Sequence, residues 1–270
     1  MDAPVQDYLL SVLQHLEREY ARMSSLFGAP VPERVATKQS EGFWFRYTNQ
    51  SDTLLCFLKG VKLISTLNAA LVLLRAGYVQ ECSALFRIAG DCYSDILFFL
   101  VPGADGYATR DQERFFKEFF QEEFEDSAHP LGSNQKRDMV SRKTIFASFG
   151  NLAKDSLNAS DAQSTLLTLH KAFSGYVHGA YPHIMELYGG NPPRFHMSGM
   201  PNTPKQVETL TQYLTELYRA IMASELVARK LGFEESRVAM RALLVGYETK
   251  LGLKPKQSPE SLVRSAKKKN

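Results

Sequence analysis

Apolar side chains recur every three or four residues along most of the chain, which is the spacing of one face of an α-helix. Capping and helix-breaking residues divide the pattern into eight predicted helices. These span residues 5–26, 51–76, 78–101, 109–127, 138–155, 160–178, 204–231 and 234–251. Strand-like alternation is scarce, so the pattern predicts an all-α fold with a single helical-bundle domain of about eight helices.

Two predicted helices, residues 51–76 and 78–101, are apolar around most of their circumference. A helix without a broad polar face is buried on all sides, so we expect both at the centre of the bundle. Residues 33–50 are polar and aromatic, contain the only tryptophan, and fit a short helix or a packed connection. The longest predicted loop covers residues 179–203, and loops of this length are often functional.

Charge is distributed unevenly along the 270 residues, whose net charge is +3. Residues 254–270 contain six basic side chains and one acidic side chain, which leaves residues 1–253 with a net charge of −2. A basic tail attracts anions without forming a binding cleft. We therefore expect one all-α domain over residues 1–253, followed by a basic, disordered tail over residues 254–270.

The sequence favours a cytoplasmic protein without a membrane partner. No basic and apolar leader opens the chain, and no uncharged apolar stretch approaches the roughly 18 residues that a membrane span requires. Cys56, Cys82 and Cys92 all lie within apolar helical patterns, where buried and reduced thiols are expected.

Motifs of several enzyme classes are absent from the sequence. It contains no nucleophile elbow, no phosphate-binding loop, no dinucleotide-binding fingerprint and no zinc-protease motif. The Glu-x-x-His pairs of di-iron bundles are also missing. His170 and His178 are separated by about 12 Å of helical rise, too far to share a metal ion. We therefore expect no cofactor and no metal site.

A first candidate group is the pair Arg87 and Asp91 in the second apolar helix. Residues four positions apart lie on one helical face, and the neighbours of this pair are apolar. A charge pair on a buried helix is costly unless both members are satisfied. One interpretation is a structural pair that braces neighbouring helices. The other places Arg87 at a cleft, where it meets an anion.

A second group surrounds the end of the predicted helix 160–178. His178 lies in its last turn, and Tyr176, Tyr181 and His183 lie beside it where the long loop begins. A favourable interaction with the helix dipole is a sufficient structural reason for a histidine here. Alternatively, His178 acts as a general base or acid near neutral pH, while the other three contact the substrate.

The segments ALFRIAGDCYSDILFFL and FSGYVHG resemble the DUF5677-type bacterial proteins of unknown function, which are grouped with the HEPN-like helical superfamily. The resemblance covers about half of the chain, over residues 51–185. In that pattern, a helix with an arginine and an acidic residue four positions later packs against a helix that ends in a histidine. The resemblance implies a HEPN-like core in which Arg87, Asp91 and His178 lie together.

Many HEPN-like proteins are metal-independent endoribonucleases of defence and stress-response systems, with active sites that form across a dimer. Their signature is an arginine that precedes a histidine by a few residues, and in this chain Lys171 occupies the corresponding place before His178. Lysine carries the charge without the planar two-pronged geometry of arginine. The resemblance implies a homodimer that acts on or binds RNA, with catalytic residues Arg87, Asp91, Lys171 and His178.

The second hypothesis is a non-catalytic helical binding or regulatory module. In this case the loop 179–203 and the phenylalanine-rich face of the predicted helix 109–127 dock a protein or a small ligand. A cleft shared by Arg87, Asp91 and His178 favours the first hypothesis, and a bare hydrophobic groove favours the second.

Overall fold

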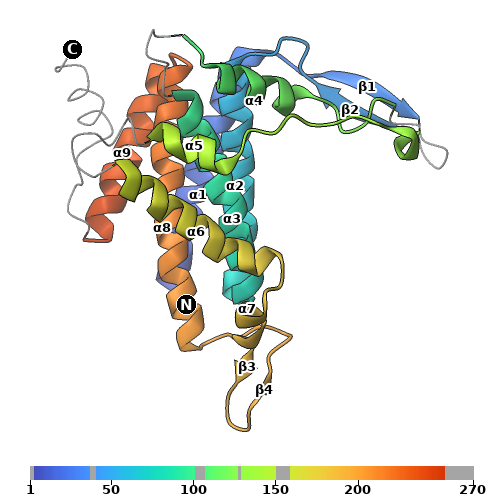
Figure 1. Ribbon diagram of the computed structural model, residues 1–270. Coiled ribbons are helices and arrows are strands. Elements are labelled where there is room, and N and C mark those ends of the chain that lie inside the picture. Colours follow the sequence, from blue (N-terminus) through green and yellow to red (C-terminus); the bar gives the residue numbers. More distant parts are fainter. Residues whose placement is uncertain (1–2, 37–40, 101–106, 127–128, 150–158, 253–270) are drawn as a thin grey trace.

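The computed structural model (Figure 1) describes residues 3–36, 41–100, 107–126, 129–149 and 159–252. The α-helices in these residues are α1 (Ala3–Ser24), α2 (Asp52–Ala76), α3 (Val79–Leu100), α4 (Arg110–Phe120), α5 (Arg142–Phe149), α6 (Ala159–Val177), α7 (Tyr181–Met185), α8 (Pro204–Lys230) and α9 (Glu234–Lys250). Two single-turn 3-10 helices are η1 (Ser25–Phe27) and η2 (Pro130–Gly132). The strands are β1 (Val31–Ala36), β2 (Glu41–Arg46), β3 (Tyr188–Gly189) and β4 (Arg194–Phe195), paired as two antiparallel hairpins. The predicted all-α fold is confirmed, because helices dominate and the strands are short.

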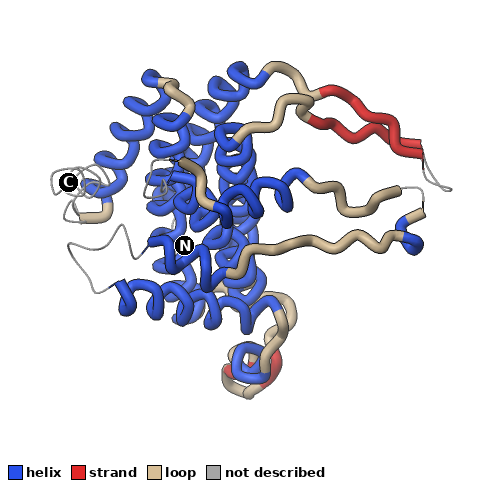
Figure 2. Tube along the Cα trace, turned by 45° about the horizontal axis from the view of Figure 1, so that its top comes forward, coloured by secondary structure: helices blue, strands red, loops and turns tan. Residues whose placement is uncertain are grey.

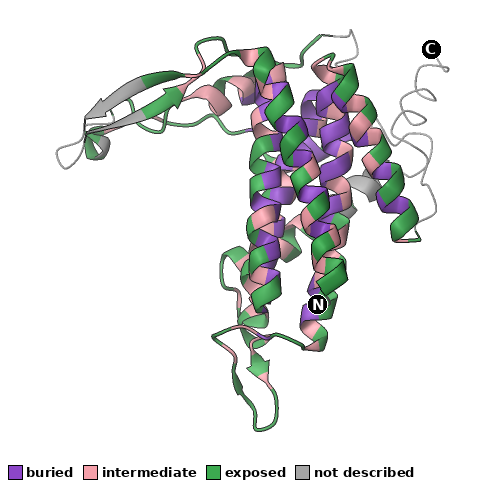
Figure 3. Cartoon of the chain, turned by 180° about the vertical axis from the view of Figure 1, so that it is seen from behind, coloured by how far each residue is buried: buried purple, intermediate pink, exposed green. Residues whose placement is uncertain are grey.

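The helices α1, α2, α3, α8 and α9 form a bundle whose buried faces point inward (Figures 1 and 3). α2 packs on α1, α3 and α8, while α3 packs on α2, α8 and the shorter helices α5 and α6. The expected central position of the two apolar helices is therefore confirmed. Tyr213 of α8 is fully buried between them, and its hydroxyl donates to the carbonyl of Leu67 over 3.3 Å.

Helix-capping residues define the ends of the long helices. The Ser51 hydroxyl accepts a hydrogen bond from the Leu54 amide at the start of α2. Gly77 ends the same helix with a φ of +82°, a conformation that glycine adopts without steric cost. Thr203 caps α8 in the same way as Ser51, and Pro204 takes the first helical position.

Residues 31–46 form a β-hairpin, so the expectation of a short helix or a packed connection over residues 33–50 is wrong. β1 and β2 pair from Val31 opposite Arg46 to Ala36 opposite Glu41. Aromatic residues in succession favour extended backbone, and Trp44 and Phe45 stay largely exposed instead of packing in the core. The hairpin extends from the same side of the bundle as the α4–α5 connection (Figure 2).

Two predicted helices are shorter in the structure. The helix expected over residues 109–127 ends at Phe120, because the acidic residues that follow form ion pairs outside the helix. Glu122 binds Arg46 of β2 over 2.5 Å, and Glu123 binds Arg137 over 2.6 Å. The helix expected over residues 138–155 is described from Arg142 to Phe149.

Among the described helices, α2 is long and apolar enough to cross a membrane by length and composition. Half of its apolar window is buried inside the protein, as in the central helix of a bundle. The expected cytoplasmic location and the absence of a membrane partner remain predictions. The tail that was expected to be disordered, residues 254–270, lies outside the described residues.

Gly60 of α2 provides a test of the packing between α1 and α2. The phenol ring of Tyr20 lies against Gly60, and a Cβ at this position would overlap the ring. Gly→Ala in a helix interior ordinarily stabilises a protein by about 0.5–1 kcal/mol. We expect Gly60→Ala to lower the free energy of unfolding by about 1–3 kcal/mol instead, because the core is overpacked.

The matched control for this prediction is Gly246→Ala in α9, where an added Cβ meets no atom of the described residues within 4 Å. Urea unfolding of both variants should give changes of opposite sign. A gain of stability at both positions would show that Tyr20 does not pack on α2 as described.

Candidate functional site

Three charged side chains lie along one face of α3 at intervals of four residues. They are Arg87, Asp91 and Asp95, and this spacing stacks them in one row. Two of the three are carboxylates one helical turn apart, which repel each other. The row therefore requires cations from neighbouring helices.

The carboxylate of Asp95 is completely buried and is bound by two cations from other helices. Lys59 of α2 lies 2.7 Å from one oxygen, and Arg142 of α5 lies 2.5 Å from the other. The Lys59 ammonium also lies over the rings of Phe115 and Phe119, at 5.4 and 5.2 Å from their centroids. A buried carboxylate costs several kcal/mol unless it is paired, so both cations are required at this place.

Asp91 is about one-quarter exposed and joins α3 to both α5 and α6. Arg87 forms an ion pair with one of its oxygens. Arg142 Nε lies 3.3 Å from the other oxygen, and His170 Nε2 of α6 lies 3.7 Å from that same oxygen. Arg142 thus bridges Asp91 and Asp95, and an imidazole completes the group.

Burial and the positive charges of Arg87 and Arg142 lower the pKa of His170 to about 4. The imidazole is therefore neutral at physiological pH. Its ring makes an edge contact with Phe146, at 5.6 Å between centroids. Its Nε2 atom is buried, and no hydrogen-bond partner for it lies among the described residues.

A cavity of about 50 Å³ lies beside this group, between α3, α6 and α8. It is lined by Arg87 and His170 on one side and by Glu216 and Arg219 of α8 on the other. Glu216 pairs with Arg219 over 2.7 Å, and burial raises the pKa of Glu216. Arg87 Nε and Glu216 Oε2 are buried and make no hydrogen bond within the described part of the chain. A cavity of this size with unsatisfied polar walls holds one or two water molecules.

The structure brings together two of the four residues for which a catalytic role was expected, Arg87 and Asp91. His178 and Lys171 are both exposed, Lys171 on α6 and His178 directly after its last residue, and neither lines the cavity beside Arg87. The imidazole that reaches Asp91 belongs to His170, about two helical turns before His178. From the sequence, packing or exposure was a sufficient explanation for His170, and no functional role was predicted for it.

Two of the three residues expected to bind substrate lie together at the far end of α6. The Tyr176 hydroxyl donates to Glu186 over 3.0 Å, and its ring meets the ring of His183 at 4.2 Å between centroids. The His183 ring rests directly on Gly175, where any Cβ would overlap it. These contacts fasten the loop to the bundle. Tyr181, in contrast, points to solvent and is 76% exposed.

Sequence reasoning missed three members of the charged group: Lys59, Asp95 and Arg142. A signal for Asp95 exists, because it follows Asp91 by four residues on an apolar helix. Lys59 has a similar signal, as a cation within the apolar helix 51–76. Arg142 has none, because its helix is short and its place beside α3 follows from tertiary packing alone.

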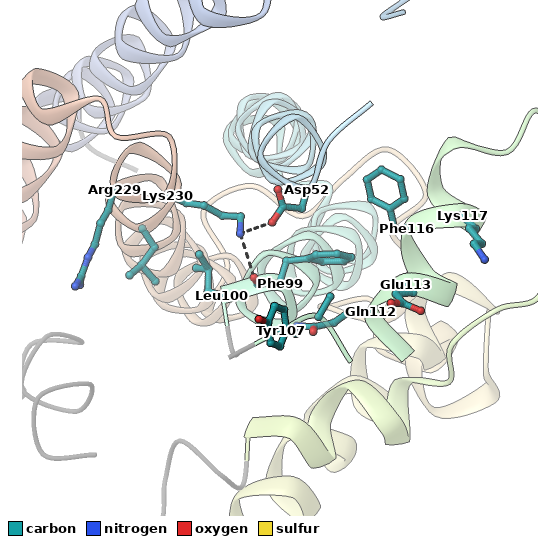
Figure 4. Close-up of a pocket in the computed structure, with 12 residues that line it drawn as sticks. Asp52, Phe99, Leu100, Tyr107, Gln112, Glu113, Phe116, Lys117, Arg229 and Lys230 are labelled. Carbon is teal, nitrogen blue, oxygen red and sulfur yellow. Dashed lines mark hydrogen bonds and ion pairs between the residues drawn. The ribbon is translucent and has the colours of Figure 1, made fainter. Parts of the chain in front are cut away.

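A separate cleft of about 880 Å³ lies between the start of α2, the ends of α3 and α8, and α4 (Figure 4). Phe99, Tyr107 and Phe116 line it, which makes its walls largely aromatic. Lys230 points toward Asp52, at 2.7 Å, and lies 3.4 Å from the carbonyl of Phe99. Lys230 and Asp52 thus offset each other's charge, and Glu113, Lys117 and Arg229 also line the cleft.

Comparisons of the chain with models of protein families, with curated proteins and with solved structures found no match. Within the described residues, no group of three or more His, Cys, Asp or Glu side chains is arranged to hold a metal ion.

The burial of Asp95 leads to a prediction about stability. Asp95→Ala leaves Lys59 without this carboxylate and reduces Arg142 to its pair with Asp91, so it should lower the free energy of unfolding by about 3–5 kcal/mol. Asp138→Ala is the control, because this carboxylate is 78% exposed and pairs with Arg114 at the surface. Its loss should cost less than about 1 kcal/mol. Similar costs at both positions in denaturant unfolding would contradict the buried charge group.

The lowered pKa of His170 predicts a dependence of stability on pH. The unfolded chain takes up a proton near the ordinary pKa of 6.5, whereas the folded chain does so only near 4. Stability should therefore fall as the pH decreases between these values. His170→Gln lacks the pH-dependent contribution of this imidazole. Its midpoints of denaturant unfolding at about pH 7 and about pH 5 should therefore differ less than those of the wild type. His178→Gln, which removes an exposed histidine just beyond the end of α6, is the control for the substitution itself.

Proposed function

We propose that this protein binds RNA at a surface formed by Arg87, Asp91, Arg142 and His170, as a HEPN-like helical protein. The observation that carries the proposal is a neutral imidazole placed beside two guanidinium groups at one partly exposed surface. The proposal is also supported by the pairing of Arg87 with Asp91 on a helix that packs against the histidine-bearing helix α6.

The balance of charge at this surface favours an anion. Lys59, Arg87 and Arg142 carry three positive charges, and Asp91 and Asp95 carry two negative charges. The side chains of Arg87 and Arg142 are 17% and 26% exposed, but Nε and Nη1 of Arg87 are buried, so a ligand would reach Arg142 more readily than Arg87. The planar fork of a guanidinium group fits two phosphate oxygens at once.

A bound phosphate would change the protonation of His170. The positive charges of Arg87 and Arg142 depress its pKa, and a phosphate between them offsets these charges. The pKa of His170 then rises toward neutrality, which is the range in which an imidazole transfers protons. In RNA cleavage, His170 would accept the proton of a 2′-hydroxyl. The 2′-oxygen then forms a bond to phosphorus, the bond between phosphorus and the 5′-oxygen breaks, and the 5′-oxygen takes up a proton from water.

This proposal changes two of the residue assignments that the family resemblance implies. His170 replaces His178, because it is the histidine that contacts Asp91. Arg142 replaces Lys171, because it reaches both carboxylates from α5.

A non-catalytic binding module is the second candidate function, and the aromatic cleft beside Lys230 favours it (Figure 4). Its volume of about 880 Å³ lies within the range of small-molecule sites, and its walls are mainly apolar. The occupant would be a molecule with an aromatic part, because Phe99, Tyr107 and Phe116 line the cleft.

The test is binding and cleavage of a labelled single-stranded RNA in the presence of a chelator. If the protein cleaves RNA, His170→Ala should lower the rate at least about a hundredfold, the scale of a lost general base. His178→Ala, the control just beyond the end of the same helix, should change the rate little. If the protein only binds, Arg87→Gln should reduce the slope of log affinity against log salt by about one, and the exposed-surface control Arg110→Gln should leave it unchanged.

Thermal unfolding of each variant separates loss of function from loss of fold. A defect in His178→Ala with a normal His170→Ala would show that the assigned histidine is wrong. If the wild type neither binds nor cleaves RNA, the RNA proposal fails, and the aromatic cleft becomes the better candidate.

A further inference from the structure

The helix α7 presents its apolar face to solvent. Tyr181, Ile184 and Met185 share one face by their spacing, and all three are exposed. The opposite side carries His183 and Glu186, which contact Tyr176 of α6. Amphipathic helices of globular proteins normally bury the apolar face and expose the polar one. The orientation of α7 is therefore explained if a partner covers its apolar face.

The exposed apolar side chains continue from α7 into the β3–β4 hairpin and form what we call the end patch. Its members are Val177, Tyr181, Ile184, Met185, Tyr188, Phe195 and Met197. The rings of Tyr188 and Phe195 contact each other across the hairpin, at 5.0 Å between centroids. The hairpin projects from the end of the bundle, and its surface is exposed (Figures 1 and 3).

The area of the end patch is large for the surface of a monomer. Its seven side chains are between 37% and 81% exposed. Since large apolar side chains present on the order of 150–250 Å² each, they expose roughly 700–900 Å² together. Patches on monomers are usually about 300–600 Å², whereas one partner of a stable interface contributes about 800 Å². The patch thus has the size of one half of an interface.

Charges on this segment indicate which partner fits. Between residues 177 and 197, Glu186 and Arg194 are the charged residues apart from histidines. Glu186 is neutralised by Lys205, at 3.0 Å. Two copies of such a surface bury apolar area with little repulsion between like charges. A lipid surface is a poorer fit, because membrane-binding surfaces usually carry several basic residues.

We infer that the end patch is the contact surface for a second copy of this chain, in a two-fold symmetric dimer. The same residues of both copies meet in such an interface. Glu186 and Lys205 lie behind the apolar face and hold α7 in the orientation that the dimer needs.

The experiment measures the molar mass of the full chain by analytical ultracentrifugation, from about 1 to about 100 µM. The wild type should be a dimer with a dissociation constant in this range. Tyr181→Glu and Met197→Glu, at the two most exposed positions of the patch, should each weaken the dimer at least about tenfold, because a charge is buried without a partner. Val238→Glu on α9, at a residue that is 54% exposed, should leave the dimer unchanged.

Circular dichroism and the melting temperature verify that each variant is folded, and either patch variant is sufficient for the test. A wild type that stays monomeric at the highest concentration overturns the inference. So does a dimer that both patch variants leave intact, since it uses another surface. Binding of the wild type to vesicles of neutral or anionic phospholipid, lost in the patch variants, would assign the end patch to a lipid surface instead.

Discussion

The carboxylate of Asp95 lies entirely out of solvent in the middle of a helical bundle, and its charge constrains where the surrounding helices can lie. A buried carboxylate is tolerated only when cations replace the water that it has lost. Lys59 provides one from α2, and Arg142 provides the other from α5. α5 has only eight residues, too few for a stable helix on its own, so its position depends on contacts such as this one. The central helix pair and the outer helices α5 and α6 are connected through a single charge group.

The same constraint produces the electrostatics of the candidate site. Arg142 forms an ion pair with Asp95, and in this position its Nε lies 3.3 Å from a carboxylate oxygen of Asp91. There it lies close enough to His170 to depress the pKa of the imidazole together with Arg87. A structural ion pair thus creates a surface with more positive than negative charge and a neutral imidazole. The structural and functional interpretations of Arg87 and Asp91 are therefore compatible: Asp95 and Lys59 carry the structural part, and Arg87 and His170 face solvent and the small cavity.

Local sequence patterns predicted most of the helices, because each has an apolar face and because α2, α4 and α8 begin at a residue whose side chain caps the helix. Ser51, Gly77 and Thr203 mark helix ends in the sequence and in the structure alike. The β1–β2 hairpin escaped prediction, because its strands are short and the side chains of Val31, Trp44 and Phe45 are exposed, so these residues add no buried positions to an alternating pattern. In the candidate site, the Arg87–Asp91 pair was predictable from a spacing of four residues. The contacts of Asp91 with Arg142 and His170 join residues that are 51 and 79 positions away, and these distances in sequence carry no local signal.

His170 within α6 and His178 directly after it illustrate why position along a helix is a poor guide to role. His178 stands at the helix end beside the long loop, where sequence reasoning expected chemistry, but its side chain is exposed. His170 lies in the helix interior, and the packing of α6 on α3 is what directs it to Asp91.

The far end of α6 serves a different purpose. Gly175 and Tyr176 hold His183 and Glu186 of α7, so the polar face of α7 is already occupied when its apolar face meets solvent. The exposure of Tyr181 and Ile184 is therefore fixed by specific contacts and does not result from a frayed helix end. α6 thus positions the charged site at its middle and supports the end patch at its end. The helical repeat sets the angle about the helix axis between the residues that do so.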